Sequence, residues 1–272
     1  MAESPSRNPP PGGASVLTSR VENEVGWIHL NRPQQRNALN GDLRRGLIAA
    51  LKQAVRDPAV RAIVLIGDGR SFCAGADIGE FDRFDEEGLA PLAADYGVML
   101  TTLRGASKPT IAAIRGAAAG IGVSLALCCD LRIATPDAFF REAFVDLGLT
   151  VDGGATWLLP RIVGSARALE LCYTGRRLGS QEAERWGLVN QVVAEDRLEA
   201  AARELAEKLA RGPRQALAAI KRSVAYGESA TFEESVDFEF LLQGTLVGAP
   251  DFREGVAAFL EKRPPRFGGG DR

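Results

Sequence analysis

Two loops of small residues are the places where a ligand could most closely approach the backbone of this chain. Residues 71–78 read Ser-Phe-Cys-Ala-Gly-Ala-Asp-Ile, and residues 115–124 read Arg-Gly-Ala-Ala-Ala-Gly-Ile-Gly-Val-Ser. Small side chains leave backbone N–H groups open to contact. The second loop leads into an expected helix, whose first N–H groups are unpaired and lie at the positive end of its dipole. This pattern suits an anion, or a carbonyl oxygen that gains charge during a reaction.

Two other interpretations fit the second loop. Gly120-x-Gly122 after a strand resembles half of a dinucleotide-binding fingerprint, but Leu125 stands where that pattern requires its third glycine. Tight packing of a strand against a helix explains the small residues equally well. The residues alone leave the packing and oxyanion interpretations open.

Histidine and cysteine chemistry is sparse. The single histidine, His29, lies in an alternating segment, residues 25–30, and is interpreted as an ordinary strand position. A histidine-based metal centre or a Ser–His–Asp triad would depend on it entirely. The four cysteines lack the paired spacing of a zinc site and are expected to be small buried hydrophobes in a reducing compartment. They are Cys73, Cys128, Cys129 and Cys172.

Composition indicates a globular chain without a strong charge bias. The 272 residues are 46% hydrophobic, and 33 basic residues balance 35 acidic ones. This balance argues against a nucleic-acid-binding protein but leaves room for a small patch that binds a phosphorylated ligand. No apolar run reaches the roughly 18 residues of a membrane-spanning helix. Residues 1–15, rich in Pro, Gly and Ser, are expected to be a disordered tail without a secretion signal, so a cytoplasmic location is predicted.

Alternating strand-like and helix-like segments would position the two loops. A hairpin is expected over residues 16–30, with its turn at Glu22-Asn23-Glu24. Helical periodicity covers 41–55, 89–104 and 123–129, and short apolar strands cover 61–66, 109–114, 131–134 and 138–140. Each loop of small residues therefore follows a buried strand.

The chain is mostly helical from Thr156 onward. Amphipathic patterns cover residues 197–210, 213–225, 231–246 and 251–261, separated by Pro or Gly. Residues 263–272 are expected to be loose. The change in composition predicts an α/β core over residues 16–210 and a helical module over residues 211–272.

Three segments in order carry a family resemblance: SFCAGADI, KPTIAAIRGAAAGIGVSLALCCDLRIA and GLTVDGGATWLLPRIVGSARALELCYTGRRLGSQEAERWGLVNQVV. They resemble the enoyl-CoA hydratase/isomerase (crotonase) superfamily, in register from about residue 16 to residue 266. DGGATWLLPRIVG is most similar to phenylacetate-pathway and dienoyl-CoA isomerases. The resemblance implies an α/β spiral of repeated ββα units and a C-terminal helical trimerisation module, commonly assembled as a dimer of trimers. It also implies an acyl-CoA substrate and no metal or redox cofactor.

The resemblance also implies roles for particular residues. The backbone N–H groups of Ala76 and Ile121 would form an oxyanion hole, although similar proteins usually have glycine at the latter position. Coenzyme A would lie along residues 32–38 and 71–78, contacting Arg36, Ala38, Ala74, Asp77, Ile78 and Gly120, with Lys262 from a neighbouring subunit. The acyl pocket would include Phe72, Ser124 and Phe144.

The acids depart from the hydratase pattern. Ser124 and Phe144 occupy the positions where similar hydratases place two glutamates, so hydration by that mechanism is not expected. In similar isomerases an aspartate at the position of Asp152 transfers the proton. The alternative role for Asp152 is to cap the following helix. Glu142 and Asp146 are weaker candidates: they would share a face with Phe144 only in an extended segment.

The expected function is double-bond isomerisation of an unsaturated acyl-CoA, with Asp152 removing and returning the proton. Three alternatives stay open. One is a hydratase that uses another carboxylate. A second is an aryl-CoA dehalogenase with a nucleophilic aspartate and a histidine base, for which His29 is badly placed. The third is a non-catalytic acyl-CoA-binding protein. A trimer or hexamer is expected, and apolar residues of the last helices would supply much of the buried surface, within or between subunits: Phe238, Phe240, Leu241, Leu242 and Phe259.

Overall fold

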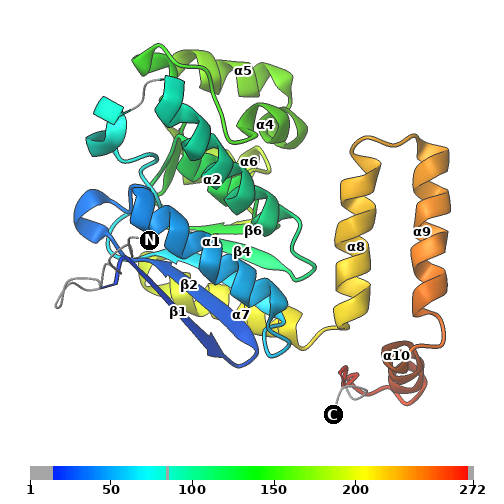
Figure 1. Cartoon of the computed structure of the whole chain (residues 1–272). Coiled ribbons are helices and arrows are strands. Elements are labelled where there is room, and N and C mark those ends of the chain that lie inside the picture. The colour runs from blue at the N-terminus through cyan, green and yellow to red at the C-terminus, as the bar shows by residue number, and fades with distance from the viewer. Residues whose placement is uncertain (1–14, 84–85, 269–272) are drawn as a thin grey trace, which may run out of the picture.

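The computed structural model describes residues 15–83 and 86–268, so the expected tail lies almost wholly outside the described residues. Figure 1 shows an α/β body with three helices, α8, α9 and α10, set beside it. The turn between α7 and α8 spans residues 211–213, next to the expected boundary at residue 210. Body and helical arm are therefore distinct parts of one chain.

A six-stranded sheet runs through the body in the order β1-β2-β3-β4-β6-β9. The expected hairpin is its only antiparallel pair within the described residues. Every residue of β3 and β4 is buried, as expected for parallel strands covered on both faces. The strands are β1 (Leu17–Glu22), β2 (Val25–Leu30), β3 (Ala62–Gly67), β4 (Thr110–Ile114), β6 (Leu131–Ala134) and β9 (Gln191–Val192).

A second sheet of three strands, in the order β5-β7-β8, was not expected from the sequence. β5 (Ala117–Ala119) lies inside the second loop of small residues and runs parallel to β7 (Phe139–Arg141). β7 pairs antiparallel with the two-residue β8 (Leu178–Gly179). Part of that loop is therefore an ordered strand, which fixes where the following helix begins.

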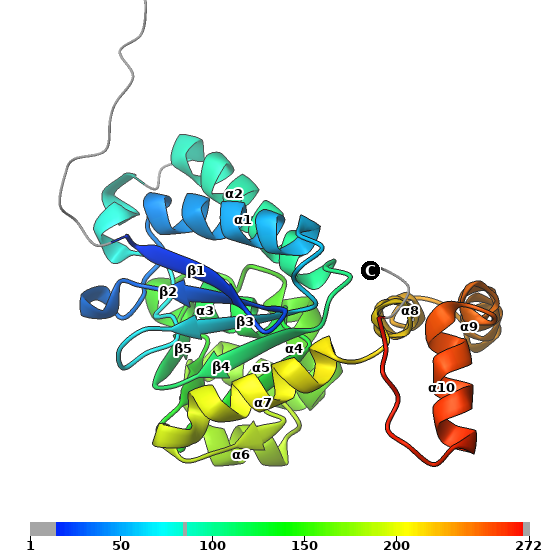
Figure 2. The same ribbon diagram turned by 90° about the horizontal axis from the view of Figure 1, so that it is seen from below.

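Helices cover both faces of the large sheet. Figure 2 shows α1 and α2 on one side and α7 on the other. The larger hydrophobic core lies on the α1 and α2 side, and the smaller one packs α7 against β2, β3 and β4. The body helices are α1 (Gly41–Arg56), α2 (Glu86–Arg104), α3 (Ile121–Leu127), α4 (Ala155–Val163), α5 (Ser165–Thr174), α6 (Ser180–Arg185) and α7 (Leu198–Ala210). Short 3-10 turns cover Pro33–Gln35, Ile78–Arg83, Val145–Leu147 and Glu195–Arg197.

The arm consists of α8 (Arg214–Gly227), α9 (Phe232–Leu246) and α10 (Pro250–Leu260). A capping box at Thr231 and Glu234 begins α9. Ion pairs join α8 and its end to the body: Lys221 contacts Asp130 at 2.9 Å, and Arg104 contacts Glu228. Among the described residues, no helix is long and apolar enough to cross a membrane.

Candidate active site

The two loops of small residues lie against each other at the carboxyl ends of β3 and β4. The Cys73 N–H donates to the Ala117 carbonyl, and the Ala119 N–H donates to the Cys73 carbonyl, each at 2.9 Å. Gly75 has a positive φ of 103°, and a Cβ on it would lie 2.9 Å from the Ala119 carbonyl oxygen. Any larger residue at position 75 would push the loops apart. The close contact brings Ala76 toward the start of α3.

The N–H groups of Ala76 and Ile121 donate no backbone hydrogen bond within the described part of the chain. The residues on both sides of the Ala76 bridge are paired: the Leu39 N–H donates to the Gly75 carbonyl, and the Asp77 N–H donates to the Leu39 carbonyl. Ile121 is the first residue of α3, where an N–H has no partner in its own helix. Gly122 allows this start of α3 to approach the first loop, because a Cβ there would lie 2.4 Å from the Cys73 carbonyl oxygen.

Tertiary packing brings Asp152 next to the start of α3. The Ser124 hydroxyl of α3 donates to the Asp152 backbone carbonyl at 3.2 Å. Gly153 packs so closely on α3 that a Cβ there would lie 2.4 Å from Ile121 Cδ1 and 2.7 Å from Ser124 Oγ. The Ile121 side chain thus fills space beside Asp152.

The capping alternative for Asp152 is wrong. α4 begins after Gly154, which is its N-cap, and no side chain caps it. Asp152 instead lines a cavity, and although the residue remains exposed to solvent, partial desolvation at the cavity wall raises the pKa of its carboxyl above its usual value. A carboxyl at a cavity wall that is not used to cap a helix is free to contact a ligand.

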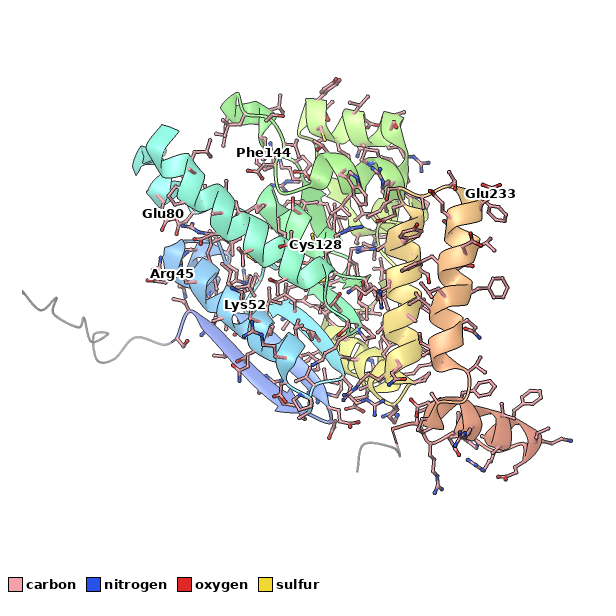
Figure 3. The ribbon with its side chains drawn as sticks, turned by 45° about the vertical axis from the view of Figure 1, so that its right-hand side comes forward. Arg45, Lys52, Glu80, Cys128, Phe144 and Glu233 are labelled. Atoms are coloured by element: carbon pink, nitrogen blue, oxygen red, sulfur yellow. The ribbon has the colours of Figure 1, made fainter. Side chains whose placement is uncertain are left out.

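The cavity has a volume of about 640 Å³, large enough for an acyl chain or a ring. One wall is α2, the second is formed by Asp152 and the start of α4, and α8 closes the rim. Cys128 also lines it and lies between α2 and α8 in the view of Figure 3. Its α2 wall comprises Leu89, Leu92, Ala93, Tyr96, Gly97, Leu100, Thr101 and Arg104.

The three residues expected in the acyl pocket do not line this cavity within the described part of the chain. Phe72 is enclosed in the hydrophobic core. Ser124 is buried and holds the backbone of Asp152. Phe144 packs on the second loop of small residues, where a Cβ on Gly120 would lie 3.6 Å from its ring. None of the three lines the cavity among the described residues.

Glu142, a weaker candidate from the sequence, is a deeply buried carboxyl. Its side chain is 2% exposed, and neither carboxyl oxygen has a hydrogen-bond partner among the described residues. Burial first, and the nearby charge of Asp152 second, raise the pKa of Glu142 to about 8. Glu142 is therefore protonated at neutral pH.

Asp146 does not lie with Glu142 and Asp152. Phe144 precedes a 3-10 turn, so the extended arrangement that would align Glu142, Phe144 and Asp146 does not occur. Asp146 is exposed and pairs with Arg141 at 2.5 Å. Glu142 alone turns inward.

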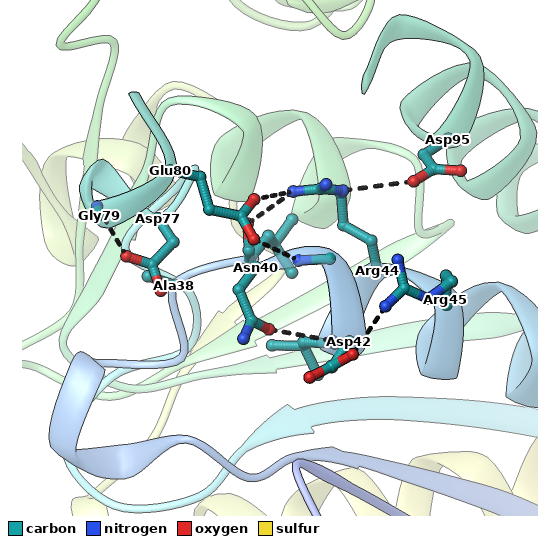
Figure 4. Close-up of polar contacts among 12 residues, drawn as sticks. Ala38, Asn40, Asp42, Arg44, Arg45, Asp77, Gly79, Glu80 and Asp95 are labelled. Atoms are coloured by element: carbon teal, nitrogen blue, oxygen red, sulfur yellow. Dashed lines mark hydrogen bonds and ion pairs between the residues drawn. The ribbon is translucent and has the colours of Figure 1, made fainter. Parts of the chain in front are cut away.

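The residues expected to bind coenzyme A gather at the first loop. The Ala74 N–H donates to the Arg36 carbonyl at 3.0 Å, and Ile78 is 74% exposed. Asp77 holds the turn: it accepts from Arg32 at 2.7 Å and from the Gly79 N–H at 3.0 Å. Burial opposes ionisation, but these bonds leave the pKa of Asp77 below its usual value. Figure 4 shows the Asp77–Gly79 contact beside the start of α1.

Of the other residues expected to bind coenzyme A, Ala38 and Gly120 lie near the first loop and Lys262 does not. Ala38 is buried where Arg32 donates to its carbonyl, and Gly120 has a positive φ of 51° at the turn into α3. Lys262 follows α10 at the far end of the arm. Within the described part of the chain it does not join the other residues, so a contact supplied by a neighbouring subunit stays a prediction.

His29 takes no part in the cavity. It is buried in β2, as the sequence predicted, and its ring nitrogens contact Arg20 and Asp68, each at 2.8 Å. Among the described residues, no cluster of three or more His, Cys, Asp or Glu side chains has the spacing of a metal site.

Comparison with known proteins gives consistent matches over nearly the whole chain. A family model described as enoyl-CoA hydratase/isomerase matches residues 20–270. A probable enoyl-CoA hydratase of Rhodobacter capsulatus is 44% identical over 94% of this chain and 99% of its own length. The 1,2-epoxyphenylacetyl-CoA isomerase of Escherichia coli is 40% identical over 93% and 98%. A crystal structure of an enoyl-CoA hydratase subunit from Geobacillus kaustophilus superposes with a TM-score of 0.89, at 40% identity, over 93% of this chain and 98% of that chain.

Proposed function

The chain belongs to the enoyl-CoA hydratase/isomerase (crotonase) family, and from this premise we propose that it moves the double bond of an unsaturated acyl-CoA, with Asp152 as the acid/base. Family membership makes the protein a crotonase-type enzyme, and the expected α/β fold with C-terminal helices is confirmed by the solved relatives.

The chemistry requires a stabilised enolate. In the proposed complex, the thioester oxygen accepts hydrogen bonds from the Ala76 and Ile121 N–H groups. Charge that develops on this oxygen is stabilised by donors already in place, which makes the neighbouring carbon chain more acidic. Asp152 then removes a proton from one carbon and returns it to another on the same face, so a single base suffices.

The observation that carries the proposal is the position of Asp152. Its backbone is bound to Ser124 of α3, three residues beyond Ile121, while its carboxyl lines the cavity. Burial raises its pKa, which makes the carboxylate a stronger base than one in water. We propose that coenzyme A lies along Arg36, Ala38 and Ala74 and is also contacted by Lys262 of a neighbouring copy. We also propose that the reaction needs no metal or redox cofactor.

The decisive experiment replaces Asp152 by asparagine. Asp152→Asn keeps the size of the side chain but cannot accept a proton, so isomerisation of 3-enoyl-CoA should fall by roughly 10²–10⁴. Because Asp152 caps no helix, the melting temperature and acyl-CoA affinity should change little. Products are followed by mass spectrometry with 3-enoyl-, 2-enoyl- and haloaryl-CoA as substrates.

The outcomes separate the alternatives. Full activity in Asp152→Asn places catalysis elsewhere. A wild-type protein that binds these thioesters but converts none is an acyl-CoA-binding protein. Release of halide from haloaryl-CoA would indicate a dehalogenase, although the contacts of His29 with Arg20 and Asp68 leave that reaction without its histidine base at the cavity.

Hydration is the second candidate, and Glu142 is the observation that favours it. Adding water needs one group to take a proton and another to supply one. We would assign these roles to Asp152 and Glu142, because burial raises the pKa of both carboxyls and the charge of Asp152 raises that of Glu142 further. Glu142 does not line the cavity among the described residues, so the one-carboxylate isomerisation stays the favoured proposal.

Glu142→Gln distinguishes the two reactions. Glutamine keeps the shape of the neutral acid but supplies no proton. Loss of 2-enoyl-CoA hydration with intact 3-enoyl-CoA isomerisation would support a hydratase role for Glu142. Unchanged rates of both reactions would show that Glu142 takes no part in proton transfer.

A further inference from the structure

Tyr96 carries a polar hydroxyl in the middle of the α2 wall of the cavity, among apolar side chains. It lies one and two helical turns from Leu92, Leu100 and Leu89, which line the same cavity. The side chain is 6% exposed, and its hydroxyl has no hydrogen-bond partner among the described residues. Because a buried hydroxyl without a partner lowers the stability of the fold, its presence here calls for an explanation.

The residues packed around Tyr96 keep water away from its hydroxyl. The Arg44 guanidinium lies 5.8 Å from the centre of its ring. Arg44 is itself held by Glu80 at 2.8 Å and by Asp95 at 3.4 Å, as Figure 4 shows. The ring is therefore clamped between α1 and the cavity, and a phenol has no other polar atom to offer.

The hydroxyl is neutral and can act as a hydrogen-bond donor. Burial first, opposed by Arg44, raises the pKa of Tyr96 above its usual value, and the charge of Asp152 raises it further. A neutral phenol neither accepts the substrate proton nor replaces Asp152 as a base. It can donate to an oxygen atom that enters the cavity.

We infer that Tyr96 binds an uncharged oxygen atom of the acyl group, and so selects ether, epoxide, hydroxyl or carbonyl-bearing acyl-CoA thioesters over hydrocarbon ones of the same shape. An anionic acyl group is disfavoured, because it would lie near the charge of Asp152. The neighbouring atoms that cover the hydroxyl must shift slightly to admit the oxygen, a change common for side chains at binding sites. The inference rests on the proposed function in taking this cavity as the acyl site.

Isosteric, unreactive ligands test the inference. Cyclohexylacetyl-CoA and its 2-, 3- and 4-tetrahydropyranyl analogues differ by one CH₂ replaced by oxygen, and none has a double bond to move. By calorimetry, wild-type protein should bind at least one oxygen-bearing isomer about tenfold more tightly than the cyclohexyl compound. Tyr96→Phe should reduce this difference to about twofold or less. It should not weaken cyclohexylacetyl-CoA binding.

A second measurement separates substrate recognition from a structural role. Because Tyr96→Phe removes an unpaired buried hydroxyl, its melting temperature should equal or exceed that of wild type. Tyr173→Phe, which removes an exposed hydroxyl from α5, is the matched control and should keep the tenfold preference.

Three results would overturn the inference: no preference for any ring isomer, a preference that survives in Tyr96→Phe, or a lower melting temperature in that variant. Failure of the proposed function is recognised separately. Asp152→Asn with full isomerase activity refutes the mechanism and leaves the oxygen preference standing. Absence of binding by every thioester would overturn both.

Discussion

The body and the arm treat apolar surface in opposite ways. In the body, β3 and β4 are buried at every residue, and α1 buries seven of its residues. In the arm, α8 buries none, α9 buries only Leu242 and α10 buries only Ala258. Large apolar side chains along the arm are exposed instead: Ile220, Val224, Phe232, Phe240, Leu241, Val247, Phe252, Val256, Phe259 and Leu260.

The body therefore has a hydrophobic core that is closed within one chain, whereas the arm leaves most of its apolar side chains exposed. Exposed apolar patches of this extent mark interaction surfaces. Figure 3 places Glu233 near the start of α9, at the outer edge of the molecule, with side chains of α9 projecting away from α8. We therefore expect further copies of the chain to cover the arm, as a trimer or hexamer.

The largest expected effect is on assembly. Phe240 and Phe259 are 73% and 83% exposed, and glutamates in their place would bury two unpaired charges in any interface. Phe240→Glu with Phe259→Glu should convert a trimer or hexamer into a 29.0 kDa monomer at micromolar concentration, as measured by light scattering. The matched change Val21→Glu, at an exposed residue of the body, should not.

Leu242 and Phe238 belong to a different group from the exposed residues. Leu242 is buried, and the Phe238 ring stacks on Tyr226 with centroids 4.2 Å apart. They hold α8 and α9 together within one chain. A wild-type protein that is already monomeric at micromolar concentration would contradict the comparison of body and arm.

The next effect is on stability. Leu65 of β3 is fully buried, and Leu65→Ala should lower the free energy of unfolding by about 2–5 kcal/mol. Leu241→Ala, the same change at an exposed position of the arm, should cost little at dilutions where the chain is monomeric. Denaturant titrations of both variants, at two protein concentrations, make the comparison. Equal losses in dilute solution would show that the arm has a core of its own.

A third effect concerns the pH dependence of stability and involves Glu142, which lies in the body. Glu142 has an ordinary pKa of 4.5 and a folded-state pKa of about 8, so the folded chain holds its proton more tightly. Its contribution to stability is fully present below pH 4.5 and is lost as pH rises through 8, at up to about 1.4 kcal/mol per unit between them.

Glu142→Gln removes this term. Melting temperatures measured from pH 5 to pH 8 should therefore decline less steeply for the variant than for wild type. Parallel curves would indicate that Glu142 is ionised in the folded protein, and would weaken the hydratase alternative.

The smallest effect compares two helical glycines. Gly97 in α2 and Gly244 in α9 both have open space where a Cβ would lie. Gly97→Ala should stabilise the chain by about 0.5–1 kcal/mol, because alanine restricts the unfolded state, and should narrow the cavity that Gly97 lines. Gly244→Ala should raise the stability of the monomer by a similar amount. A methyl group at an interface would in addition weaken assembly. Thermal melts with light scattering test both.

Local patterns predicted most elements of the fold. The expected strand at 131–134 is β6, and the expected helix at 231–246 is α9 with one residue less. The helix expected at 123–129 instead begins at Ile121, since Gly120 ends β5 and turns the chain. Periodicity could not predict β5 or β8, because a strand of two or three residues is defined by its partner and not by its own sequence.

Residue type and short-range spacing were enough to predict the apolar strands, the amphipathic helices and the two small-residue loops. The preference for Asp152 over Ser124 and Phe144 came from the family resemblance and stays a prediction. Tertiary structure alone decided that Asp152 lines a cavity instead of capping α4, that Glu142 is buried without a partner, and that the Tyr96 hydroxyl lies unpaired beside that cavity. The physical reason is that desolvation depends on atoms distant in the chain, which local periodicity does not encode.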